Sequence, residues 1–264
     1  MSSRKSFFNA AGTVPATLLF ATLLFTGCDT GEIESSVLRL ISRIEHYQDN
    51  GSGVALYQMV EYRYDSQDRM TEMKITGEDG ITTQGVFSYP ANSLAFGSAI
   101  YTLNSDGSIA SWSTGDLLTG TCTYSNGYLK QREYYVEFET IPGIISGTTT
   151  ETYTWEQGNI ATIAIEQSYP GASPWTYSLS LIFEYGSIQN RPCSIDFFLT
   201  DFSVPKGWYG KPIRYLPFKW ISRSESGADD ISIYRYETDS RGYPTRIFVQ
   251  TNGEDEELRT VIYY

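Results

Sequence analysis

One pattern governs the chain, and it is first seen in Tyr62-Arg63-Tyr64-Asp65-Ser66-Gln67-Asp68-Arg69-Met70. Two aromatic residues spaced two apart end a segment, polar residues turn the chain, and an apolar residue begins the next segment. Degenerate copies are Tyr124-Ser125-Asn126-Gly127-Tyr128-Leu129, Tyr153-x-Trp155-Glu156-Gln157-Gly158-Asn159-Ile160 and Tyr234-x-Tyr236 through Tyr243-Pro244. Residues two apart on a strand share one face of a sheet. The pattern therefore predicts strands whose paired aromatic side chains line one side of a sheet.

Turn signals divide the rest of the chain into short segments in which apolar and polar residues alternate. The signals are Asp79-Gly80, Asp106-Gly107, Asn126-Gly127, Gly158-Asn159 and Asn252-Gly253. Asn-Gly and Asp-Gly supply the positive φ angles of two-residue hairpins, so each signal reverses a strand. We expect about fourteen strands joined by short hairpins, with no helical segment between them. The predicted fold is all-β, with a single large rolled antiparallel sheet that is barrel-like.

We expect this sheet to form one domain over residues 37–264, because no Pro- or Ser-rich linker divides the sequence. The longest irregular region runs from Thr200 to Pro217 and contains Pro205, Pro212 and Pro217. Proline cannot donate to a central ladder, so this region is predicted to be a crossing loop or a sheet edge. The repeats are unequally spaced, which argues against a propeller or a solenoid.

The first 27 residues have the form of a lipoprotein signal peptide. Arg4 and Lys5 make a basic start, and an apolar segment then runs from Val14 to Phe25. This segment is shorter than the roughly 20 apolar residues of a membrane-spanning helix. Cys28 follows directly after Thr-Gly, which resembles a bacterial lipobox, where the cysteine is lipidated and becomes the first residue. Residues 28–36 would then be a flexible tether. The alternative is an ordinary secretory signal followed by an incidental cysteine.

Composition argues against several classes of protein. The chain has 264 residues and carries 31 Asp and Glu against 19 Lys and Arg, whereas a nucleic-acid-binding protein needs a basic surface. Aromatic residues make up 15%, which is too many for an acidic disordered chain. Cys122 and Cys193 are the thiols that remain after Cys28. An oxidising compartment would allow them to pair, and two buried thiols are the alternative.

The residues do not suggest an established catalytic mechanism. His46 is the single histidine, which argues against a multi-histidine metal site, and no Gly-x-Ser-x-Gly nucleophile elbow accompanies it. Glu137 and Glu139 share a strand face, as a glycosidase carboxylate pair would, although such a pair is usually surface charge. The sequence also lacks a Gly-rich phosphate loop, a Cys/His zinc cluster and a calcium loop. We therefore predict no catalytic residues, no metal site and no cofactor.

Two Pro/Gly-rich segments carry aromatic side chains that are candidates for ligand binding. The first ends at Trp175, and the second contains Trp208 and Tyr209. Sugar rings stack on such side chains, and loops carry binding more often than scaffold strands do. The alternative is that these rings fold back over an open end of the roll and close its core, because tryptophan buries a large apolar area.

A series of short motifs resembles a known family in the order in which the motifs occur. The motifs are Tyr62-Arg63-Tyr64-Asp65 with Arg69, Tyr101 to Gly107, Tyr124 to Leu129, Trp155 to Asn159, Gly210-Lys211-Pro212 with Leu216-Pro217, and Arg241 to Thr245. They are similar to a family of Bacteroides-type lipoproteins of unknown function with a porin-like fold, over nearly the whole mature chain. The repeats also resemble the tyrosine–aspartate repeats of bacterial shell-forming toxins. The resemblance implies a rolled antiparallel sheet or barrel and implies no activity.

A porin-like fold need not span a membrane. A spanning barrel requires an apolar outward band about 25 Å tall on every strand. Glu137 and Glu139 interrupt one predicted strand face, and Arg246 interrupts another. A lipid anchor would also be redundant on a spanning barrel. We therefore expect a water-soluble roll. The terminal Tyr263-Tyr264 resembles the signature of outer-membrane barrels and represents the spanning alternative.

These features together predict a non-enzymatic envelope protein that contacts the membrane through a lipid anchor at Cys28. We expect it to be attached to the outer membrane, to face the periplasm or the cell surface, and to bind a glycan, a peptide or a partner protein. A nucleic-acid partner is not expected. The alternatives are a hydrolase that acts on polysaccharide through paired carboxylates and a purely structural envelope component.

Overall fold

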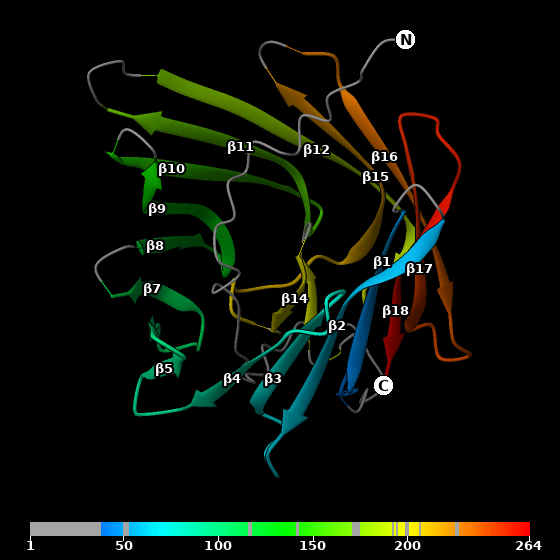
Figure 1. Cartoon of the computed structure of the whole chain (residues 1–264), viewed down its shortest axis with the longest axis horizontal. Helices are drawn as coiled ribbons and strands as arrows, with labels where there is room; N and C mark the ends of the chain where they lie inside the picture. The colour runs from blue at the N-terminus through cyan, green and yellow to red at the C-terminus, as the bar shows by residue number, and fades with distance from the viewer. Residues whose placement is uncertain are drawn as a thin grey trace.

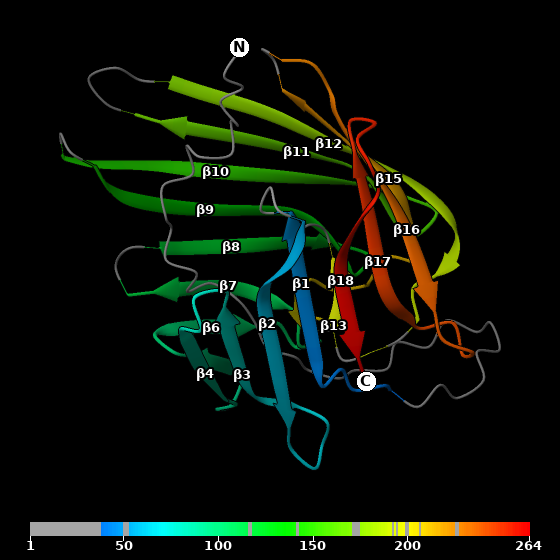
Figure 2. The same ribbon diagram turned by 45° about the vertical axis from the view of Figure 1, so that its right-hand side comes forward.

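The computed structural model is a closed antiparallel β-barrel (Figures 1 and 2). It describes residues 38–49, 53–115, 118–140, 143–170, 175–191, 193, 195–198, 201–205, 207–224 and 227–264. Sixteen strands of these residues form the barrel, and two more form a separate antiparallel pair. Among the same residues, none forms a helix long and apolar enough to cross a membrane.

The strands follow one another around the barrel in chain order, except that β12 pairs with β15 and that β13 and β14 pair only with each other. They are β1 (Arg43–Asp49), β2 (Val54–Tyr64), β3 (Met70–Gly77), β4 (Thr82–Ser88), β5 (Ser93–Phe96), β6 (Ala99–Leu103), β7 (Ile109–Thr114), β8 (Leu118–Ser125), β9 (Tyr128–Thr140), β10 (Gly143–Glu156), β11 (Asn159–Tyr169), β12 (Trp175–Gln189), β13 (Ile195–Phe198), β14 (Asp201–Pro205), β15 (Tyr215–Ser224), β16 (Asp230–Thr238), β17 (Pro244–Thr251) and β18 (Glu257–Tyr263).

The barrel is closed by its first and last strands, drawn in blue and red in Figure 2. β1 pairs with β18, with Arg43 opposite Tyr263 and His46 opposite Thr260. The all-β prediction is therefore confirmed, and the expected number of strands is approximately right. The short pair β5 and β6 is harder to recognise in the sequence, because Gly97-Ser98 joins it without an Asn-Gly or Asp-Gly signal.

The buried apolar side chains face the interior of the barrel, whereas others, such as Val86 and Ile100, are exposed on its outer face. In β8, Gly120 and Cys122 are buried, whereas Thr121 and Thr123 between and beside them are exposed. The paired aromatics of the sequence repeat share this inward face, as predicted. Tyr62 is buried, and Tyr64 packs against the same core. The pairs Tyr153 with Trp155 and Tyr234 with Tyr236 also belong to the core or pack against it.

Charged side chains pair across neighbouring strands on the outward face. In four cases the partners stand directly opposite each other in the strand register, where cross-strand pairs interact most closely. These ion pairs are Lys74–Glu61 (3.3 Å), Arg63–Glu72 (3.6 Å), Lys219–Glu184 (2.6 Å) and Arg246–Glu237 (3.4 Å). The barrel therefore has an apolar interior and carries ion pairs between strands on its outside.

In each of seven strand pairs among the described residues, the O–H or N–H group of an aromatic side chain makes a hydrogen bond that joins the two strands at one end. The ring of the second strand donates to a backbone carbonyl at the start of the first strand, at the end of the pair that no turn joins. We call these seven contacts the base bonds. They run from Tyr64 to Ile41 (2.7 Å), Tyr89 to Met70 (2.5 Å), Tyr124 to Ile109 (2.8 Å), Trp155 to Leu129 (2.7 Å), Tyr185 to Ile160 (2.8 Å), Tyr236 to Pro217 (2.7 Å) and Tyr264 to Pro244 (2.9 Å).

The base bonds define two ends of the barrel. The base end carries these bonds together with turns such as Asn126-Gly127, where both residues have positive φ (54° and 81°), as a type I′ hairpin requires. The distal end carries the opposite turns, among them Asp79-Gly80 and Asn252-Gly253. The turn signals found in the sequence therefore lie at both ends, and the aromatic signal marks the base end.

Residues 207–214, which we call the closing segment, lie against three successive turns at the base end. The backbone N–H of Lys211 donates to Gly127 (2.8 Å), and that of Arg214 donates to Gly158 (3.0 Å). The carbonyl of Trp208 accepts from the N–H of Ile109 (2.9 Å). Residues 207–214 agree with the crossing loop predicted between Thr200 and Pro217, whereas Asp201–Pro205 of the same region forms strand β14. The ladder between β12 and β15 is irregular at Pro217, as expected for a residue that cannot donate.

A matched pair of substitutions on β2 tests the base bonds. Tyr64→Phe removes the hydroxyl that donates to Ile41, and the free energy of unfolding should fall by about 1 kcal/mol. Tyr62→Phe removes a buried hydroxyl with no hydrogen-bond partner among the described residues, so stability should be unchanged or higher. Denaturant unfolding of both variants measures the difference. An equal loss in the two variants would contradict a stabilising role for the base bonds.

Candidate binding cavity

A charged network lies on the inward face of β9 and β10. Arg132 stands directly opposite Glu151 in the strand register and binds its carboxylate with two hydrogen bonds, at 2.9 and 2.8 Å. Tyr134 and Tyr153 also donate to this carboxylate. The third nitrogen of the guanidinium donates to the hydroxyl of Tyr209 (3.0 Å). Each carboxylate oxygen therefore accepts two hydrogen bonds.

The network holds Glu151 as an anion inside the barrel. Burial raises the pKa of this carboxyl, but the charge and hydrogen bonds of Arg132 outweigh that effect and hold the pKa below its usual value. Burial also raises the pKa of Tyr153 well above its usual value, so its hydroxyl remains a proton donor. Because the carboxylate is fully engaged, the network ties β9, β10 and the closing segment together and offers little to a ligand.

The structure places two of the predicted ligand-binding residues inside the barrel. Trp208 is 1% exposed, and its ring packs against that of Tyr101 with centroids 4.8 Å apart. Tyr209 joins the Arg132 network. Both belong to the closing segment, so they match the alternative stated above, in which aromatic rings fold back over an open end of the roll. Trp208 has no exposed ring face for a sugar, whereas Tyr209 is half-buried and its ligand-binding role stays a prediction.

Two other predicted residues are not placed by the structure. The side chain of Trp175, the first residue of β12, lies outside the described part, so its ligand-binding role stays a prediction. Cys28 and the signal peptide also lie outside the described residues. Cys122 is a free, buried thiol, so it does not pair with Cys193. Burial raises the pKa of the Cys122 thiol to about 12.

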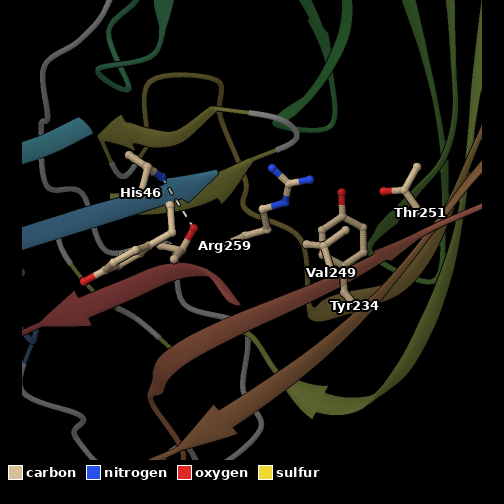
Figure 3. Close-up of a pocket in the computed structure, with 7 residues that line it drawn as sticks. His46, Tyr234, Val249, Thr251 and Arg259 are labelled. Carbon is tan, nitrogen blue, oxygen red and sulfur yellow. Dashed lines mark hydrogen bonds between the residues drawn. The ribbon is translucent and has the colours of Figure 1, made fainter. Parts of the chain in front are cut away.

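A separate cavity of about 260 Å³ lies between β1, β16, β17 and β18 (Figure 3). Its lining residues are His46, Tyr47, Tyr234, Val249, Thr251, Arg259 and Thr260. Thr251 is the last residue of β17, at the distal end, and the closing segment lies at the base end. This part of the interior therefore combines a cavity with side chains that carry hydroxyl, imidazole and guanidinium groups.

Packing and pairing fix the geometry of the cavity wall. Figure 3 shows the Arg259 guanidinium and the Tyr234 phenol extending to the same side of the sheet. Arg259 Nη2 lies 3.3 Å from the Glu257 carboxylate. The His46 Nδ1 lies 3.4 Å from the Thr260 hydroxyl, and burial lowers the pKa of this histidine to about 4. The imidazole is therefore neutral at pH 7.

Sequence reasoning missed Arg132, Glu151 and Arg259. A signal for the first two exists, because each precedes an inward aromatic by two residues, as in Arg132-x-Tyr134 and Glu151-x-Tyr153. Arg259 has no such signal. It is the extra residue of a bulge between β17 and β18, where Ile247 pairs with Thr260 and the next residue pairs with Leu258. A bulge reverses the alternation of faces locally, which strand periodicity does not reveal.

Among the residues of the cavity, the sequence pointed to His46 as the single histidine and to Tyr234 as an aromatic of the repeat. The structural neighbours of His46 come from the far end of the chain, at β16, β17 and β18. Among the described residues, no group of three or more His, Cys, Asp and Glu side chains is arranged to hold a metal ion. The cavity is therefore a candidate for binding through hydrogen bonds and ring contacts.

Breaking the buried ion pair should cost far more stability than breaking an exposed one. Glu151→Gln leaves the Arg132 charge uncompensated in the interior, and the free energy of unfolding should fall by about 3 kcal/mol. Glu61→Gln breaks the outward ion pair with Lys74 and should change the free energy of unfolding by less than about 1 kcal/mol. Urea unfolding at pH 7 compares the two. Similar losses would show that the inward network is solvated like the outward pairs.

Acid should destabilise the barrel through His46. The unfolded chain takes up the proton as the pH falls through 6.5, whereas the folded protein stays neutral down to about 4. The contribution of His46 to the free energy of unfolding is therefore fully present above pH 6.5. The free energy of unfolding should fall by about 2 kcal/mol between pH 7 and pH 5. His46→Asn should lose this part of the pH dependence, as unfolding measured at pH 7, 6 and 5 would show. A variant with the same slope as the wild type would assign the effect to other groups.

Comparisons with known proteins relate the barrel to solved structures. The crystal structure of a porin-like protein from Bacteroides uniformis matches with a TM-score of 0.57 and 19% identity, covering 85% of this chain and 96% of that chain. That of a porin-like protein from Bacteroides vulgatus matches with a TM-score of 0.56 and 11% identity, covering 86% and 98%. No protein-family model matches the sequence, and no curated protein matches it.

At these identities the likeness concerns the fold alone. The resemblance to a lipoprotein family and to tyrosine–aspartate repeats therefore stays a prediction, whereas the porin-like fold that it implied is found. This chain shares the architecture of a closed antiparallel barrel with porin-like proteins of Bacteroides.

Proposed function

We propose that the protein is a non-enzymatic envelope lipoprotein whose barrel stands in water, is held to the outer membrane by lipid on Cys28, and binds a glycan, a peptide or a partner protein. The observation that carries the proposal is the row of directly opposed ion pairs on the outward face. This observation bears on whether water or lipid surrounds the barrel.

The outward ion pairs favour water over lipid as the surrounding medium. Lys74 of β3 and Lys219 of β15 lie in the middle of their strands, where a spanning barrel would present apolar side chains to the bilayer. A Lys or Arg at the bilayer midplane costs about 2–4 kcal/mol on the lipid face of such a barrel. In water the same pairs cost almost nothing, so the distribution of charge supports a barrel that is attached to a membrane from outside.

The place where the chain enters the barrel supports an orientation. Ser42 donates its N–H to Tyr263 (2.8 Å), and Arg39 pairs with Asp239 in the turn between β16 and β17, at the base end. Cys28 precedes Leu38 by ten residues (38 − 28), which span at most about 35 Å of chain. A lipid on Cys28 would therefore hold the base end toward the membrane, with the distal end directed away.

Replacing the anchor tests the proposal. In the variant, a cleavable signal peptide without cysteine replaces residues 1–28, so no apolar signal remains on the mature chain. We expect the protein to leave the membrane fraction and to appear in the soluble periplasmic fraction, folded as judged by its melting temperature. Mass spectrometry of the wild-type N-terminal peptide should show a lipidated Cys28.

The matched control keeps residues 1–28 and carries Cys122→Ser, which alters a different thiol of the chain. This protein should stay in the membrane fraction until detergent is added. If the anchor-replaced variant still requires detergent for extraction, the barrel itself contacts lipid and the proposal is wrong. An unmodified Cys28 in the wild-type peptide would also contradict it.

A further inference from the structure

We infer that the cavity between β1, β16, β17 and β18 binds a single neutral sugar unit, such as the end of an uncharged glycan. The inference deepens the proposed binding function and rests on it, but it does not depend on the lipid anchor. It is carried by the size of the cavity, by the charge balance of its wall and by the fixed aromatic ring of Tyr234.

The volume of the cavity limits how much of a ligand it holds, because the cavity is open and the rest of a ligand can extend beyond it. The volume of the cavity is about 260 Å³. It lies below the range of about 300–1,000 Å³ that drug-sized ligands occupy. One sugar ring is therefore a suitable occupant, and a longer glycan would have to enter with one end only.

The charges of the cavity wall balance. Arg259 contributes one positive charge, and the Glu257 carboxylate 3.3 Å away compensates it. His46 is neutral at pH 7 because burial disfavours its charged form. An anionic ligand would have to compete with Glu257 for the guanidinium, and a cationic ligand would be repelled by it. The wall therefore suits an uncharged molecule.

The polar groups of the wall suit a ligand with many hydroxyls. The guanidinium of Arg259 only donates hydrogen bonds, whereas the hydroxyls of Thr251 and Thr260 donate and accept. A sugar hydroxyl can donate to one neighbour and accept from another, so it matches this mixture of groups.

The ring of Tyr234 supplies the apolar part of the site. It meets Trp220 edge to face, with centroids 6.3 Å apart, and it stacks on Tyr236 at 6.4 Å. These contacts hold the ring in one orientation, and an aromatic face that is already fixed loses little entropy when a ligand stacks on it. Val249 lies opposite Tyr234 in the strand register and adds apolar surface beside it.

Saturation-transfer NMR on the purified wild-type protein tests the inference. The probes are glucose, galactose and N-acetylglucosamine, with glucuronate and glucosamine as their charged analogues. We expect at least one neutral sugar to bind with a millimolar dissociation constant and both charged analogues to bind more weakly. Tighter binding of glucuronate or of glucosamine would overturn the inference, and so would the absence of binding by all three neutral sugars.

Substitutions locate the binding. Tyr234→Ala should weaken it by at least about tenfold, because it removes the stacking face. Thr251→Val removes the hydroxyl at the end of β17 and keeps the shape of the side chain, so the fold should be preserved. Sugar binding should weaken by about fivefold. The matched control Tyr57→Ala changes an exposed tyrosine of β2 outside the cavity and should leave binding unchanged. Equal losses in Tyr57→Ala and Tyr234→Ala, or full binding by Thr251→Val, would place the sugar elsewhere.

Discussion

The hydrogen bond from an inward aromatic ring to a backbone carbonyl, repeated around the base end, is the contact on which this barrel depends. A strand pair joined by a turn at one end tends to separate at the other, where the backbone ladder stops. Tyr64, Trp155 and Tyr236 each close such an end with a bond of 2.7 Å. The same rings bury their apolar faces in the core, so one residue type supplies both packing and register.

An aromatic interior has a consequence for the outside of the molecule. Strand side chains alternate, so filling the inside with apolar residues sends the polar ones outward. In a porin the alternation runs the other way, with the apolar residues toward lipid. The opposed pairs of Glu61 with Lys74 and of Glu184 with Lys219 follow from this reversal. A shared barrel architecture is therefore compatible with a different relation to the membrane.

The two polar regions of the interior differ in how fully their hydrogen bonds are satisfied. Around Glu151 the donors of Arg132, Tyr134 and Tyr153 use the carboxylate completely, which makes that region rigid and structural. In the distal cavity, Glu257 Oε2 compensates the charge of Arg259 at 3.3 Å, and the hydroxyls of Thr251 and Thr260 belong to the wall. These hydroxyls can also bond to a hydroxylated ligand, because a hydroxyl both donates and accepts.

The sequence by itself determined the all-β class, the antiparallel hairpins and the shared face of aromatic pairs such as Tyr153 and Trp155, because these depend on turn chemistry and on a period of two. The tertiary structure decided what depends on register between distant segments. It paired β1 with β18, it turned Trp208 into the core, and through a bulge it brought Arg259 to the cavity near His46. Local sequence patterns do not show which distant strands become neighbours when a sheet closes. A one-residue bulge also reverses the face of the sheet to which alternation would assign a side chain.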